Sequence, residues 1–70
     1  MNANPKIARI SAGLTQAALA EILGISRWVY MTLEKNPKNF TIDLAERFSV
    51  AVKMPVDEIF FSGDSISNRT

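Results

Sequence analysis

The sequence predicts an all-α fold, a compact bundle of five short helices. Two observations lead to this prediction. Between residues 16 and 35, apolar residues recur three or four positions apart on both sides of one glycine, Gly24, which is typical of two helices joined by a tight turn. In addition, a residue that can cap a helix N-terminus precedes each of four segments with helical spacing: Asn4, Thr15, Ser26 and Thr41.

The first predicted helix spans residues 5–12. Asn4 is its N-cap, and Pro5 takes the first helical position, where the missing N–H of proline is not needed. We expect Ile7 or Ala8 to be buried and Gly13 to end the helix.

The second and third predicted helices cover residues 16–23 and 27–35. Ala20 is small where two helices would cross closely, and Gly24 can adopt the positive φ that the turn between them requires. This pattern is typical of a helix-turn-helix, whose second helix usually enters the DNA major groove. Four apolar residues would hold the two helices together: Leu19, Leu23, Tyr30 and Leu33.

The fourth and fifth predicted helices cover residues 42–53 and 56–61, the last one opened by Pro55. A single domain would extend over residues 1–64, followed by a flexible polar tail at 65–70. The face of the fourth helix that closes the core is predicted to hold Ile42, Ala45, Phe48, Ser49 and Val52.

The composition argues against several functional classes. The chain has no cysteine and no histidine, so it lacks thiolates, the commonest metal ligand and the commonest general base. We therefore predict no metal site, no cofactor and no enzymatic activity. No signal peptide and no apolar stretch of about 18 residues is visible, which favours a cytoplasmic protein without membrane contact. A 70-residue chain buries only about 60% of its unfolded surface, which favours dimerisation.

The charge is distributed unevenly. Residues 1–40 carry five cationic and two anionic side chains, a net +3, whereas residues 41–70 carry three and five, a net −2. The half that contains the predicted helix-turn-helix is therefore the basic one, which favours a nucleic-acid partner.

The segments GLTQAALAEILGIS, LEKN and MPVDEIFF closely resemble the Cro/repressor-type (XRE-like) helix-turn-helix family, over about residues 6–61. The resemblance implies a sequence-specific transcriptional regulator of phage or prokaryotic type, a repressor or Cro-like protein that binds double-stranded operator DNA as a homodimer. By position it implies these DNA-binding residues: Gln16, Ser26, Arg27, Trp28, Met31, Thr32, Lys35, Asn36, Lys38 and Asn39.

The resemblance also implies roles for individual residues. Gln16 would either contact the DNA backbone or a base near it, or remain a solvated polar residue of the first turn. Arg27 would either bind guanine or clamp a phosphate, and Thr32 would either meet a thymine or remain solvated. Arg9 and Glu34 match an ion pair that ties the first helix to the third, with a structural role.

The predicted recognition helix is unusually apolar, because Trp28, Val29 and Met31 lie beside Arg27. Three alternatives are open. Trp28 and Val29 can pack on thymine methyl groups. The three apolar residues can instead bind a partner protein such as a repressor or toxin, which would make the chain an antirepressor or antitoxin. Trp28 can also fold back onto the core.

Two other positions depart from the family pattern. Tyr30 occupies a core position more often held by Ile or Val, and Asn36 stands where Gly is usual, in a left-handed conformation that Asn tolerates. At the C-terminal end, Val56, Phe60 and Phe61 are the predicted dimer contact, which would favour a palindromic operator. Alternatively, Phe61 packs under the first helix of its own chain.

Overall fold

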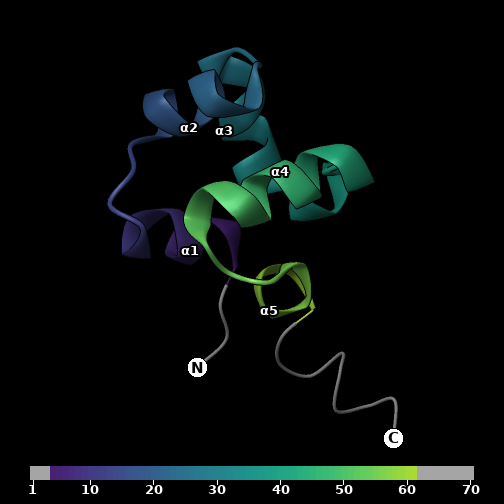
Figure 1. The fold of residues 1–70 in the computed structure, drawn as a ribbon. Coiled ribbons are helices and arrows are strands. Elements are labelled where there is room, and N and C mark those ends of the chain that lie inside the picture. The colour runs from purple at the N-terminus through teal and green to yellow at the C-terminus, as the bar shows by residue number, and fades with distance from the viewer. Residues whose placement is uncertain (1–3, 62–70) are drawn as a thin grey trace, which may run out of the picture.

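The computed structural model describes residues 4–61, and these residues form only helices, turns and loops (Figure 1). The all-α prediction is confirmed. Every α-helix begins at the predicted residue and ends there or one residue earlier, whereas the short 3-10 turn η1 was not predicted. The predicted tail and the predicted domain end at residue 64 lie outside the described residues. The elements are α1 (Pro5–Ser11), α2 (Gln16–Leu23), α3 (Arg27–Lys35), η1 (Pro37–Asn39), α4 (Ile42–Val52) and α5 (Val56–Phe60).

The four predicted N-caps are all formed. Asn4 Oδ1 accepts a hydrogen bond from the backbone N–H of Ile7 at 2.9 Å. The hydroxyls of Thr15, Ser26 and Thr41 each accept one from the backbone N–H three residues further on, at 3.0 to 3.1 Å. These bonds satisfy donors that a helix leaves unpaired at its first turn, so local sequence sets where four helices start.

The helix ends follow the sequence less uniformly. Gly13 and Gly24 adopt φ values of 77° and 75°, as their turns require. Lys53 ends α4 in the same left-handed region, at φ 58°, a backbone conformation that residues other than glycine rarely adopt. The expectation for Asn36 is wrong, because its φ is −130°: the chain leaves α3 without a left-handed residue and turns into η1.

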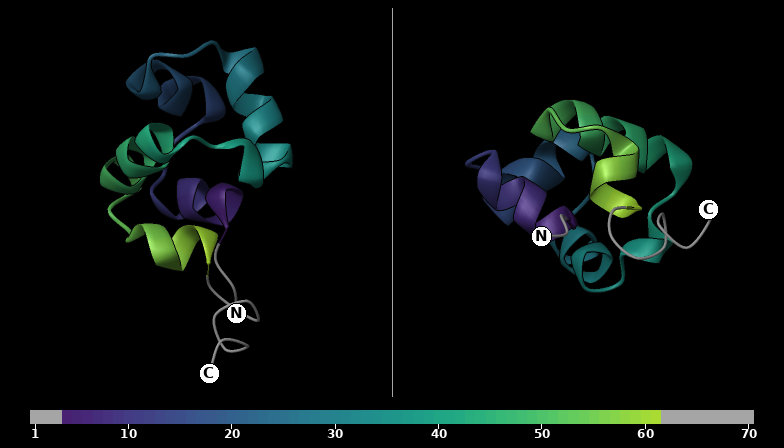
Figure 2. Two further views of the ribbon diagram at one scale, coloured as in Figure 1. Left: turned by 90° about the vertical axis from the view of Figure 1, so that its right-hand side faces the viewer. Right: turned by 90° about the horizontal axis from the view of Figure 1, so that it is seen from below.

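The helices pack around α4. In the view of Figure 1, α2 and α3 lie above α4, and α1 and α5 lie below it; Figure 2 shows the same arrangement from two further sides. The main packing contacts join α2 to α3 and to α4, and join α1, α4 and α5 to one another. None of the helices in residues 4–61 combines the length and apolar composition needed to cross a membrane.

The core lies where these helices meet. Phe48 of α4 stacks on Tyr30 of α3 with ring centroids 6.4 Å apart, and edge-to-face contacts link it to Phe40 and Phe60. The buried residues that form this core cluster are Ala8, Leu19, Ala20, Leu23, Tyr30, Phe48, Val52 and Ile59.

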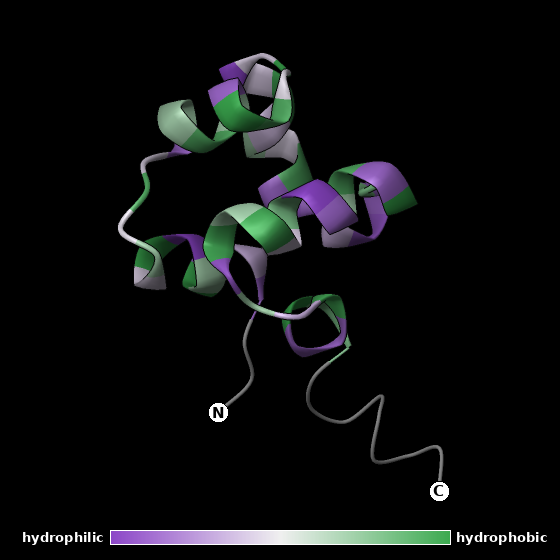
Figure 3. Ribbon diagram, viewed as in Figure 1, coloured by the Kyte–Doolittle hydropathy of each residue, from purple (hydrophilic) through white to green (hydrophobic). Residues whose placement is uncertain are grey.

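The predicted inner face of α4 is correct at Ala45, Phe48 and Val52, which are buried. Ser49 is half-buried, and the prediction is wrong at Ile42, which is 80% exposed. Ile42 is the first residue of α4, at the side of an open groove that no described helix covers. Helical spacing places Ile42 on the apolar face of α4, but it does not show that no other helix packs against the start of α4. Figure 3 shows the alternation of hydrophobic and hydrophilic segments along α4.

Candidate nucleic-acid interface

The outer face of α3 consists of exposed side chains. Ser26 caps the helix and is exposed, Met31 is half-buried, and Tyr30 and Leu33 are buried on the opposite face. Trp28 is 71% exposed, so the alternative in which it folds back onto the core is wrong. The exposed residues of α3 are Arg27, Trp28, Val29, Thr32 and Lys35.

Two hydroxyls of this region have their hydrogen bonds within the helix. Thr32 Oγ1 donates to the carbonyl oxygen of Val29 at 2.7 Å, and Ser26 Oγ accepts from the N–H of the same residue. Because its O–H is donated within the helix, Thr32 is left with its methyl group and an oxygen acceptor for an outside partner. The segment after α3 adds three further exposed polar residues next to Lys35: Asn36, Lys38 and Asn39.

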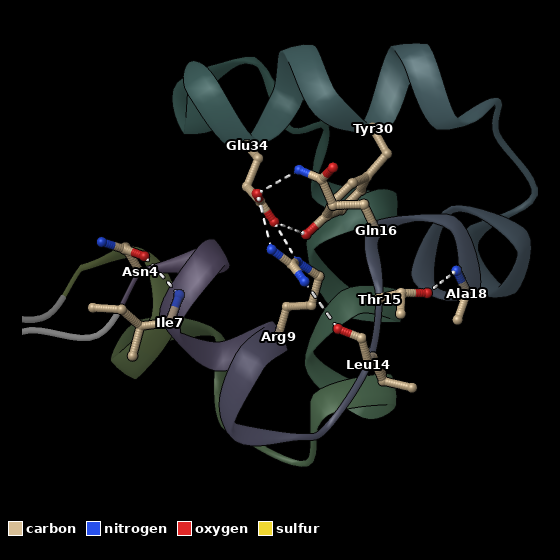
Figure 4. A network of polar contacts seen from close by, with 9 residues as sticks. All are labelled: Asn4, Ile7, Arg9, Leu14, Thr15, Gln16, Ala18, Tyr30 and Glu34. Atoms are coloured by element: carbon tan, nitrogen blue, oxygen red, sulfur yellow. Dashed lines mark hydrogen bonds and ion pairs between the residues drawn. The ribbon is translucent and has the colours of Figure 1, made fainter.

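Behind this face, the structure brings Arg9 and Glu34 together (Figure 4). Arg9 Nε lies 2.7 Å from Glu34 Oε2, and the two side chains are only 11% and 6% exposed. Arg9 Nη1 also donates to the carbonyl oxygen of Leu14 at 2.9 Å. The pair thus ties α1 to α3 and to the loop that precedes α2.

Two further side chains bind the same carboxylate, and neither contact was predicted. The Tyr30 hydroxyl donates to Glu34 Oε2 at 2.6 Å, and Gln16 Nε2 donates to Oε1 at 2.9 Å. Figure 4 shows Arg9, Gln16 and Tyr30 converging on Glu34 from α1, α2 and α3. A Tyr four residues before a Glu on one helix was a usable signal, because such pairs share a face. Nothing local marks the contact of Gln16, which lies 18 positions from Glu34.

The network controls the ionisation of its members. Burial by itself raises the pKa of Glu34, but hydrogen bonds from Arg9, Tyr30 and Gln16 outweigh it, so the pKa of this carboxyl is lowered. Burial, the hydrogen bond to Glu34 and its negative charge raise the pKa of the Tyr30 phenol well above its ordinary value. At neutral pH Glu34 is therefore a carboxylate and Tyr30 a hydrogen-bond donor.

Gln16 of α2 and Arg27 of α3 line the same hollow, although they come from different helices. Both line a hollow of about 430 Å³ together with Thr15, Ala17 and the end of α1. An amide and a guanidinium in one hollow offer several N–H donors and one positive charge, which is chemistry suited to an anion.

The residues predicted for the dimer lie around a second hollow. Val56 and Phe60 are half-buried, and Phe60 packs on Phe40 with ring centroids 4.9 Å apart. Phe61 is 54% exposed. These three residues and Ile42 line an apolar groove of about 480 Å³ between α5 and the start of α4.

Sequence reasoning missed one structural residue beside the helix-turn-helix. Arg47 of α4 donates from Nη1 to the carbonyl oxygen of Leu23 at 2.9 Å, at the end of α2, where helix carbonyls lack partners. Arg47 also pairs with Asp43 at 3.2 Å. The spacing of Asp43 and Arg47 predicts that pair, but not the capping of another helix.

Comparison with protein families gives a match over most of the chain. The model of a family described as helix-turn-helix matches residues 6–59. Comparisons with curated proteins and with solved structures found no match.

Proposed function

Since the chain belongs to the Cro/repressor-type helix-turn-helix family, we propose that it is a sequence-specific DNA-binding regulator of transcription that reads the major groove with α3. It would act in the cytoplasm of a prokaryotic cell, as a repressor or Cro-like protein, by occupying its operator and without catalysing a reaction.

The observation that carries this proposal is the charge of the exposed face of α3. Its exposed residues include two cations, Arg27 and Lys35. Glu34, the only acidic residue of α3, is turned inward and neutralised by Arg9. A helix that hides its carboxylate and exposes its cations is suited to the negative potential of DNA.

We assign roles to the exposed residues from their positions. Gln16 and Arg27 share the hollow at the start of α2, which favours the phosphate-clamp alternative for Arg27. Ser26, Met31 and Thr32 would lie toward base edges in the groove. The residues after α3 would contact phosphates: Lys35, Asn36, Lys38 and Asn39.

Trp28 would read thymine methyl groups. Its ring is 71% exposed and lies next to Val29, which is 41% exposed. The apolar group that a base presents in the major groove is the C5-methyl of thymine, so an apolar side chain there would pack on thymine. Replacing thymine by deoxyuridine in a bound site should therefore weaken the wild type and leave Trp28→Ala unaffected.

We also propose a homodimer, in which each copy would place its α3 in one half of the operator. The apolar groove beside Val56, Phe60 and Phe61 leaves hydrophobic surface that a second copy would cover, and a two-fold dimer would favour a palindromic operator.

The second candidate function is protein binding, in an antirepressor or antitoxin that uses Trp28, Val29 and Met31. The observation that favours it is the exposed Trp28 and Val29 pair, since aromatic residues and Met are enriched at interface centres.

Fluorescence anisotropy of a labelled random-sequence duplex, measured from low to moderate salt, tests the proposal. DNA binding predicts an affinity that falls steeply with salt. Absence of binding at low salt would contradict the proposal and favour the protein partner.

A further inference from the structure

We propose that Tyr30 and Glu34 are positioning residues for the DNA contact of Gln16. In this inference the buried network fixes the amide of Gln16 at the start of α2, so that one N–H is held inside and the other is presented to a phosphate. The inference rests on the proposed DNA binding of the chain.

The orientation of the Gln16 amide follows from the charge of Glu34. An ionised carboxylate only accepts hydrogen bonds, so it selects the NH₂ end of the amide, and Nε2 donates to Oε1 at 2.9 Å. An NH₂ group has a second N–H, and this donor is available to the hollow that Gln16 and Arg27 line. A phosphate oxygen is an acceptor and fits that donor.

The position of the carboxylate is fixed in turn by two other donors. Tyr30 and Arg9 both donate to Oε2, at 2.6 and 2.7 Å. Oε1 accepts the bond from Gln16 at 2.9 Å and a longer one from Arg9 Nη2 at 3.4 Å. Arg9 also balances the negative charge, so the carboxylate behind Gln16 does not repel an approaching phosphate. A free Gln side chain would lose conformational entropy when it bound DNA, whereas this side chain is already ordered by its hydrogen bond to Glu34.

The phenol of Tyr30 gives a clean test, because Tyr30→Phe removes one hydroxyl and keeps the ring that stacks on Phe48. Ser49→Ala is the matched control. It also removes one half-buried hydroxyl, which donates to the carbonyl oxygen of Met54 at 2.6 Å in another part of the molecule. Both variants should lose some thermal stability, and the DNA assays are run where circular dichroism shows each variant fully folded.

The first readout needs no DNA. Gln16 is the only glutamine in the chain, so labelling with ¹⁵N-glutamine gives a single side-chain NH₂ signal in an NMR spectrum. The inference predicts that one proton of this pair exchanges slowly in the wild type and in Ser49→Ala. In Tyr30→Phe this proton should exchange faster, because the carboxylate that accepts it is less well held.

The second readout is a double-mutant cycle on DNA affinity. Tyr30→Phe should weaken binding about 3- to 10-fold, the range expected from one hydrogen bond. In the Gln16→Ala background the same change should have less than about a 2-fold effect, as should Ser49→Ala in the wild type. Non-additivity of this kind cannot arise from a general loss of stability.

The outcomes separate the inference from the proposed function. Equal effects of Tyr30→Phe in both backgrounds, or an unchanged Gln16 signal in Tyr30→Phe, would overturn the inference while DNA binding stands. A wild type with the ordered Gln16 signal but no affinity for any duplex would overturn the proposed function, and with it the DNA role of the network.

Discussion

The ion pair of Arg9 and Glu34 allows a quantitative prediction about stability. We consider three variants: Arg9→Met, Glu34→Leu and the double substitution. Each replacement fills much of the same volume with apolar atoms, so the loss of charge and hydrogen bonds dominates the result. The side chains are 11% and 6% exposed, which makes this a buried pair. Breaking such a pair from one side leaves an unpaired buried charge and costs about 3–5 kcal/mol.

The two single variants should differ. Glu34→Leu removes the acceptor of three donors, those of Arg9, Tyr30 and Gln16, and leaves the Arg9 guanidinium buried without its partner. Arg9→Met leaves Glu34 with two hydrogen bonds. We therefore expect Glu34→Leu at the upper end of the range, near 5 kcal/mol, and Arg9→Met nearer 3 kcal/mol.

These costs are large for a chain of this size. At roughly 0.05–0.15 kcal/mol per residue, 70 residues give a stability of about 4–10 kcal/mol. Arg9→Met should lower Tm by at least about 12 °C, since 1 kcal/mol corresponds to about 4–8 °C in a small domain. The double substitution removes both charges, so it should be more stable than Glu34→Leu alone.

Urea unfolding followed by circular dichroism measures all three variants. Asp43→Asn serves as the control, because it breaks the exposed pair with Arg47 and should cost less than about 1 kcal/mol. Single variants that each lose less than about 1 kcal/mol, with a double substitution equal to their sum, would refute the assignment of a structural pair.

Three further predictions follow from single residues. The pKa of Glu34 is lowered in the folded protein, so its contribution to stability is present above its unfolded pKa of about 4.3 and is lost as the pH falls through the folded pKa. Urea unfolding at a series of acidic pH values should therefore show a shallower fall in the free energy of unfolding for Glu34→Gln than for the wild type. Lys53→Gly should raise the free energy of unfolding by about 0.5–1 kcal/mol in the same assay, because glycine adopts the left-handed conformation at the end of α4 without strain, and no gain would contradict this. Phe61→Ser should lower the dimer fraction in analytical ultracentrifugation and weaken binding to a palindromic duplex more than to a half-site; an unchanged association constant would remove Phe61 from the proposed dimer contact.

The positions of the helices could be predicted because their determinants are local. Four helices are capped by a side chain that accepts a hydrogen bond from the backbone N–H three residues further on: those of Asn4, Thr15, Ser26 and Thr41. Gly24 allows the turn between α2 and α3. Such interactions involve a few neighbouring residues and can be read from the sequence alone.

Apart from the conformation of Asn36 and the η1 turn, the errors and omissions concern contacts between distant residues. Ile42 has the spacing of a core residue but no helix to cover it, and Gln16 has the position of a solvent-exposed polar residue but donates to Glu34. Arg47 caps the end of α2 from 24 positions away. Periodicity shows which face of a helix is apolar, but the neighbour that meets each residue depends on how the helices pack.

The structure of α3 separates the residues that determine stability from those that would determine binding. Tyr30 and Leu33 are buried on one face, whereas Arg27, Trp28 and Thr32 are exposed on the other. Substitutions of the exposed residues should change the free energy of unfolding by less than about 0.5 kcal/mol. Their effects on DNA affinity therefore report on binding alone.

Glu34 is the exception to this separation. It belongs to the buried network, but it also accepts the hydrogen bond from Gln16, which lines the hollow at the start of α2. A change at Glu34 should therefore reduce stability and DNA affinity together, whereas a change at Trp28 should alter sequence preference alone. Comparing Glu34→Gln with Trp28→Ala on the same set of duplexes, at a temperature where both are folded, tests whether one helix carries these two separate functions.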